Sequence, residues 1–117
     1  MLVTVAKRLV VSGLNTVYYS QPVEVPMLET SFRLATIVLA LTGSSTLSVK
    51  VDVGNDMFNW TEDGQGALTI TAPGLVSKTF QGITSRFARI KYILVVGTNP
   101  IAIVDANLNT QPNQPIF

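Results

Sequence analysis

Hydrophobic and polar residues alternate along two stretches of the chain. In residues 47–53 every second residue is Leu or Val, and the residues between them are Ser, Lys and Asp. A period of two is typical of a β-strand that buries one face. Residues 87–96 alternate in the same way at first and then become apolar on both faces. This pattern predicts a second strand whose far end is buried on both sides.

Shorter apolar runs fill much of the remaining sequence. We expect further strands at Val3–Val11, Val17–Tyr19, Val23–Val25, Ala67–Thr71, Ser77–Phe80 and Ile101–Leu108. Gly, Pro, Asn and Asp cluster between these runs, where tight turns favour them. Closely spaced strands with turn signals between them predict an all-β fold. We therefore expect residues 1–108 to form a single β-sandwich or jelly roll of about eight strands.

Residues 31–42 have a periodicity that fits either a helix or a buried strand. The apolar residues of this stretch are Phe32, Leu34, Ile37, Val38, Leu39 and Leu41. The turn residues Gly43-Ser44-Ser45 follow, and then comes the clear strand at 47–53. A hairpin is therefore the economical interpretation, and the helix remains open.

Residues 109–117 show no strand period and contain Pro112 and Pro115. Prolines favour an extended conformation and cannot donate a hydrogen bond within a central strand ladder. The segment ends in Ile116 and Phe117, which are unusual residues for a free tail. We expect an extended C-terminal arm that grips a neighbouring subunit, with capping of its own sandwich as the alternative.

Charge is scarce in this sequence. Charged residues make up 13% of the chain and hydrophobic residues 47%, whereas soluble domains average about 25% charged residues. Part of the surface is therefore expected to be covered by other copies or by a larger assembly. The alternative is a monomer whose surface is rich in uncharged polar residues.

Nucleic acid and membrane are not expected as partners. The net charge is +1, which creates no strong field toward either partner. The longest apolar run is far shorter than the roughly 20 residues that span a bilayer. The first residues do not resemble a signal peptide because their charges follow the apolar stretch. We expect synthesis in a cytoplasm without export by that route.

Candidate catalytic and metal-binding residues are few. The sequence has no Cys and no His, which removes thiolate chemistry, disulfides and the commonest general base. Ser48 and Lys50 share a strand face, but such a pair is commonplace. Oxygens for calcium could come from Asp52, Asn55, Asp56, Glu62 and Asp63. Their spacing matches no EF-hand loop, and local turn bonding is the simpler interpretation. We expect a non-enzyme without cofactor or metal; a small hydrolase is the weakest alternative.

Aromatic residues offer the other candidate site. Trp60, Phe58, Tyr18 and Tyr19 could present rings to a sugar or a base. A single Trp in a small β domain is more often a core residue, so we expect Trp60 to be buried. Adjacent residues of a strand point to opposite faces, so one of the two tyrosines is expected inside and the other outside.

Two segments carry a family resemblance. Residues 49–61, with the sequence VKVDVGNDMFNWT, are followed by Phe80-Gln81-Gly82-Ile83 and by RFARIKY at 86–92. Over about forty residues this order resembles discoidin, or coagulation-factor type C, domains. The resemblance implies a galactose-binding-like jelly roll in which Asn55 and Asp56 form a turn beneath a core plug, Trp60. Family members are longer and carry a disulfide, and their ligand loops are compressed here, so their carbohydrate or lipid binding is not implied.

The whole chain is similar in style to small structural proteins of tailed bacteriophages. It is short and rich in Thr, Asn and Gln, and it lacks Cys and His. That resemblance implies a virion structural protein, such as a capsid decoration or head-to-tail component, made in the host cytoplasm. Its partners would be copies of itself and other virion proteins. The alternative is a carbohydrate-binding module for surface attachment, which rests on the discoidin-like motif.

Overall fold

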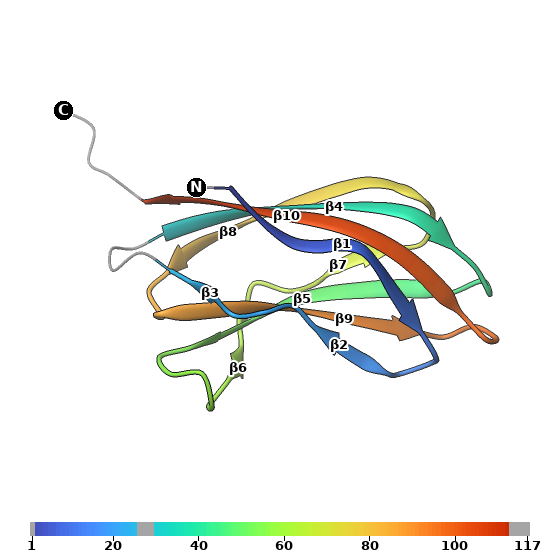
Figure 1. Cartoon of the computed structure of the whole chain (residues 1–117), viewed down its shortest axis with the longest axis horizontal. Coiled ribbons are helices and arrows are strands. Elements are labelled where there is room, and N and C mark those ends of the chain that lie inside the picture. Colours follow the sequence, from blue (N-terminus) through green and yellow to red (C-terminus); the bar gives the residue numbers. More distant parts are fainter. Residues whose placement is uncertain (1, 26–29, 113–117) are drawn as a thin grey trace.

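The computed structural model describes residues 2–25 and 30–112, which form ten β-strands and no helix. The strands make two antiparallel sheets that face each other (Figure 1). The predicted all-β sandwich is confirmed, and the arrangement is consistent with a jelly roll. No helix able to span a bilayer occurs in the described part of the chain.

Sheet A has four strands, and each pairs antiparallel with its neighbours. Their order across the sheet is β1 (Leu2–Ser12), β10 (Ile101–Pro112), β4 (Thr30–Leu41) and β8 (Gly74–Ile83). The first and last of the described strands thus lie side by side, and β10 is a central strand. Register shifts interrupt β1 between Thr4 and Ala6 and between Ala6 and Leu9.

Sheet B is built around the two long alternating strands that the sequence predicts. They are β5 (Thr46–Gly54) and β9 (Phe87–Val95), which pair along their full length. Short strands flank them: β2 (Val17–Tyr19) and β3 (Val23–Glu24) pair with β9, and β6 (Thr61–Glu62) and β7 (Leu68–Ile70) pair with β5.

The core lies between the two sheets. Alternate residues of β5, namely Leu47, Val49 and Val51, are at most 1% exposed. Tyr92 of β9 and Phe80 of β8 are the largest fully buried side chains. The hydroxyl of Tyr92 has no hydrogen-bond partner among the described residues, and burial raises its pKa far above the usual value for tyrosine.

Residues 31–42 form a strand, so the helix alternative is wrong. Leu34, Thr36 and Val38 of β4 point into the core, whereas Ile37 and Leu39 are exposed on the outer face. A register shift between Ile103 and Val104 of β10 places an extra β4 residue at this point. The period of two is obscured because apolar side chains occupy both faces and a bulge interrupts the alternation.

The boundary predicted at 108/109 is wrong. Strand β10 continues to Pro112, which pairs with Thr30 of β4. Pro112 is the final residue of the strand, so its missing N–H falls at the end of the ladder, where proline is tolerated. The rest of the predicted arm, with Pro115, Ile116 and Phe117, lies outside the described residues and stays a prediction.

Candidate functional site

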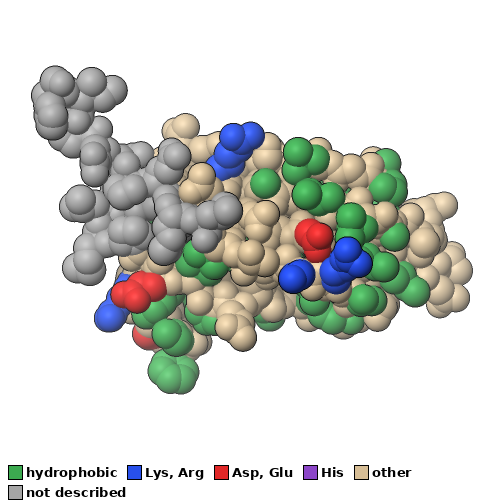
Figure 2. All heavy atoms as spheres, turned by 45° about the horizontal axis from the view of Figure 1, so that its top comes forward, with side chains coloured by type: hydrophobic (Ala, Val, Ile, Leu, Met, Phe, Trp, Pro, Cys, Tyr) green, Lys and Arg blue, Asp and Glu red, His purple; other side chains and the backbone are tan. Residues whose placement is uncertain are grey.

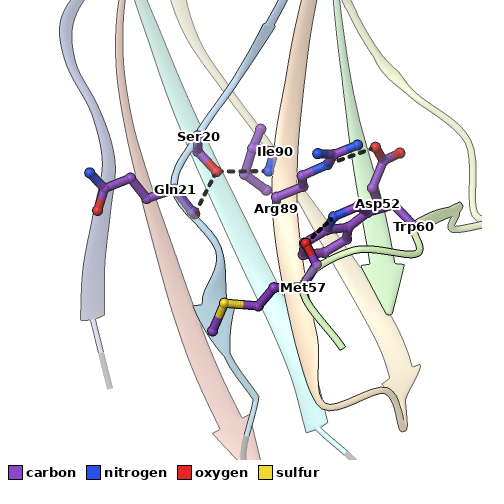
Figure 3. A network of polar contacts seen from close by, with 7 residues as sticks. All are labelled: Ser20, Gln21, Asp52, Met57, Trp60, Arg89 and Ile90. Carbon is purple, nitrogen blue, oxygen red and sulfur yellow. Dashed lines mark hydrogen bonds and ion pairs between the residues drawn. The ribbon is translucent and has the colours of Figure 1, made fainter. Parts of the chain in front are cut away.

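An arginine, an acid and two aromatic rings meet on the outer face of sheet B. Arg89 of β9 lies opposite Asp52 of β5, and its Nε donates a hydrogen bond to Asp52 Oδ2 at 3.2 Å. The guanidinium carbon is 3.7 Å from the centre of the Tyr19 ring and 4.5 Å from that of the Trp60 ring. Both distances are within the range of cation–π contacts. We call Tyr19, Asp52, Trp60 and Arg89 the Arg89 cluster; Figure 3 shows Arg89 beside Asp52 and Trp60.

The strand that carries Tyr19 is fixed to β9 by Ser20. The Oγ of Ser20 accepts the backbone N–H of Ile90 at 2.8 Å and donates to the carbonyl of Gln21 at 3.1 Å (Figure 3). Tyr19 is 46% exposed, whereas Tyr18 packs against the core and its hydroxyl bonds to Ser12. The prediction that one tyrosine faces inward and the other outward is confirmed.

The prediction that Trp60 plugs the core is wrong. Trp60 is half-buried and lies outside the core cluster, on the outer face of sheet B. Its indole N–H donates to the carbonyl of Met57 at 3.3 Å, and its ring covers Arg89. The chain leaves β5 at Gly54 and returns over the guanidinium, which offers the ring a cationic partner instead of an apolar one.

Asn55 and Asp56 lie in the bend between β5 and Trp60. The Asp56 carboxylate accepts the backbone N–H groups of Phe58 at 2.9 Å and Asn59 at 2.7 Å. These bonds, with a third from the Asn59 amide, lower the pKa of Asp56. Asn55 Oδ1 accepts the backbone N–H of Arg86 at 3.1 Å. Hydrogen bonds to Asn55 and to Asp56 therefore both stabilise the bend.

This bend presents apolar side chains to solvent. Phe58 is 89% exposed and Met57 is 54% exposed. A side chain at Gly54 would place its Cβ 2.4 Å from the carbonyl oxygen of Asn59, so the close approach of the two segments requires glycine. The bend holds Phe58 outward by fixed backbone geometry.

The remaining acidic residues of the calcium hypothesis are bound locally. Glu62 pairs with Lys50 at 2.9 Å, and this hydrogen bond and charge lower the pKa of Glu62. Asp63 accepts the backbone N–H of Gln65 at 3.3 Å. Among the described residues no three acidic side chains come together as metal ligands. The Lys50 ammonium is paired with Glu62 and not with Ser48.

The outer face of sheet A carries exposed apolar side chains on all four strands. Ile37 of β4 lies opposite Leu75 of β8, which is 66% exposed. Val10 of β1 lies opposite Ile103 of β10. Figure 2 shows hydrophobic side chains gathered on the half of this surface away from the grey residues. The sheet A patch consists of Val10, Ile37, Leu39, Leu75, Ile101 and Ile103.

A hollow of about 310 Å³ lies at the edge of the sandwich, between residues 3–7 of β1 and residues 21–23. Among the described residues, Lys7 is the only ionisable residue in its lining.

Sequence reasoning alone does not find the two surfaces. Ile37 and Leu39 resemble core residues, and Arg89 resembles an ordinary outward position of a strand. The available signal for the patch is that 31–42 is apolar on both faces of a strand. For the cluster it is the alternation that places Asp52 and Arg89 on outward positions of β5 and β9.

Comparison with solved structures gives a similarity in fold. A scan against protein-family models gives no match, and neither does a search of the curated proteins. Among solved structures, the chain is similar to TmCBM61 in complex with beta-1,4-galactotriose, at 12% sequence identity and a TM-score of 0.48. The similarity covers 89% of this chain and 69% of that chain. At this level it does not extend to a ligand or a site; the sandwich class follows from the two sheets themselves.

Proposed function

We propose that this protein is a non-enzymatic structural protein that acts by packing against copies of itself or against other proteins. The sheet A patch carries the proposal, because every strand of one sheet contributes an exposed or half-exposed apolar side chain to it. Contiguous apolar surface on a soluble protein marks an interaction site. The low charge content of 13% points in the same direction.

The specific form that we propose is a virion structural protein of a bacteriophage, as a capsid decoration or head-to-tail component. Its support is the short chain, rich in Thr, Asn and Gln, together with a sheet face that an assembled particle would cover. Repetition of a small contact on a symmetric particle makes it effective, because neighbouring subunits are already held in place.

A carbohydrate-binding module is the second candidate, and the Arg89 cluster favours it. Tyr19 and Trp60 present rings beside a charged group on an open sheet face, as sugar-binding surfaces require. However, one face of each ring is already in contact with the guanidinium, and the guanidinium is bonded to Asp52. The cluster therefore has fewer free contacts to offer a ligand than the sheet A patch has.

Light scattering after size-exclusion chromatography separates the two candidates. We expect the molar mass of the wild-type chain to rise above that of one chain as the concentration increases through the micromolar range. Retention on an immobilised glycan is measured in parallel. A chain that keeps the mass of a monomer throughout, and that a glycan matrix retains through Tyr19 and Trp60, would contradict packing and establish the second candidate.

A further inference from the structure

We infer that the sheet A patch is the interface of a two-fold symmetric dimer, in which the sheet A faces of two copies pack against each other. This inference rests on the proposed function and names the partner. Within residues 2–25 and 30–112 nothing covers the patch: Leu75 is 66% exposed, Val10 52% and Leu39 46%. Large apolar residues of this kind are usually found in a protein core, but here they lie on a face that water reaches.

The side chains of the patch stand in two adjacent rows. Ile37 and Leu75 form one row across β4 and β8, and Val10 and Ile103 form part of the next row across β1 and β10. Alternate residues of a strand are about 7 Å apart and neighbouring strands about 4.8 Å apart. Rows of side chains with this spacing fit between the rows of another sheet that has the same twist and lies about 10 Å away. A second sheet A is a surface of that shape.

The area of the face suits a dimer of modest affinity. Four strands about 4.8 Å apart and about ten residues long outline roughly 600 Å². A standard interface buries about 800 Å² on each partner, and a specific contact should bury about 1,000 Å² in total, or about 500 Å² per partner. The contact is therefore large enough to be specific when the whole sheet A face takes part, and we expect it to dissociate in the micromolar range.

The charges beside the patch are of both signs, so they do not select a partner of opposite charge. No member of the patch is charged, but Asp105 lies directly opposite Ile37 and accepts the backbone N–H of Arg8, and Arg8 and Arg33 are exposed on strands of the same sheet. A net charge of +1 produces little repulsion between copies. A two-fold contact requires that the surface match itself, and a face that carries charges of both signs beside apolar residues is compatible with that condition.

The outer face of sheet B provides the contrast. It carries Lys50, Lys91 and Arg89 with Asp52 and Glu62, so burying it would remove several charges from water. Val17 of β2 lies on that side and is 38% exposed, while Ile37 of the patch is 39% exposed. The two residues form a matched pair for a test.

The test compares Ile37→Glu and Leu75→Glu with Val17→Glu by sedimentation velocity across the micromolar range. We expect wild type and Val17→Glu to reach the mass of two chains, and both patch variants to dimerise at least about ten-fold more weakly. Circular dichroism confirms that each variant keeps the fold. Leu75→Glu keeps the test decisive if Ile37→Glu fails to fold, because Leu75 is more exposed and lies on an edge strand.

A second measurement uses the absence of cysteine from the sequence. A single cysteine at Leu39→Cys, on central strand β4 of sheet A, is treated with a short bismaleimide linker. We expect a covalent dimer from Leu39→Cys and none from the matched Val17→Cys.

The outcomes separate this inference from the proposed function. If the wild-type chain associates but the two patch variants associate equally well, the dimer face is wrong and packing as a function stands. An oligomer larger than two chains overturns the two-fold dimer but not the proposed function. A wild-type chain that stays a monomer overturns the dimer and limits the proposed function to packing against other proteins.

Discussion

At the scale of single residues, Arg89 organises the outer face of sheet B. The Asp52 side chain is only 10% exposed, and a buried carboxylate is costly unless a hydrogen-bonded cation accompanies it. Arg89 provides that bond, and the rings of Tyr19 and Trp60 lie against its guanidinium. The four side chains therefore stabilise one another, which explains an aromatic surface without requiring a ligand.

Asp56 gives this region a dependence on pH. Backbone bonds from Asn59 and Phe58 hold its pKa below the ordinary value. A depressed folded-state pKa contributes stability that is complete above the unfolded-state pKa, near 3.9, and is lost as the pH falls through the folded-state value. We expect the wild type to lose more stability than Asp56→Asn between pH 7 and pH 3, measured by urea unfolding. Equal losses would show that these bonds do not favour the ionised form.

Trp60 shows where prediction from sequence stops at this scale. Alternation along β5, ending at Gly54, is sufficient to place a turn at Asn55 and Asp56. The direction in which Trp60 points depends on Arg89, which is distant in the sequence and becomes its neighbour only when β9 pairs with β5. A non-local cation–π contact leaves no local pattern, so the general preference of tryptophan for the core gives the wrong answer here.

At the scale of elements, the edges of sheet A are protected in two ways. Bulges interrupt β1, and Arg8 adopts a positive φ of 50° there, which makes the strand a poor template for pairing. On the opposite edge, the side-chain amide of Gln65 bonds to both the N–H and the carbonyl of Gln81 in β8, each at 2.8 Å. Gln65 thus occupies backbone groups that another strand could otherwise use.

We expect Gln65→Ala to expose this part of β8. The loss of two exposed hydrogen bonds costs about 1 kcal/mol, and the freed edge increases aggregation. Urea unfolding measures the first effect, and light scattering during storage at high concentration measures the second. Gln21→Ala is the matched control, because its side-chain amide has no hydrogen-bond partner in the described residues. Equal aggregation of the two variants would contradict a role for Gln65 at the edge.

The elements themselves are largely predictable, and strand β4 shows why some are harder. The alternation in β5 and β9 is clear because their outer faces carry Ser, Lys, Asp and Arg. In β4 the outer face carries Ile37 and Leu39. Apolar residues therefore occupy both faces of the strand, and the alternation of apolar and polar residues that identifies a strand is missing. The ambiguity of residues 31–42 in the sequence and the exposure of the patch have the same cause.

At the scale of the whole molecule, the two outer faces differ in character. Sheet B carries the paired charges and the aromatic rings, and sheet A carries the apolar patch (Figures 2 and 3). Sheet A also carries charged residues, among them Asp105 opposite Ile37, but its exposed apolar side chains come from all four strands. The outer face of sheet A is therefore the one better suited to cover by another protein.

This division predicts how salt acts on association. Charge-driven contacts weaken as added salt screens them, whereas apolar burial is strengthened by sulfate, which is excluded from protein surfaces. We expect sodium chloride to leave the dissociation constant within about two-fold of its low-salt value, since the residues of the patch are uncharged and the charged residues beside them, Asp105 and Arg8, are of opposite sign. Sodium sulfate is expected to lower that constant. Sedimentation velocity of the wild type in each salt measures both effects. Leu75→Glu is the control, because we expect sodium sulfate to strengthen its association less than that of the wild type. If sodium chloride instead weakens association several-fold, charged residues carry the contact, and burial of the apolar side chains of sheet A is not what drives it.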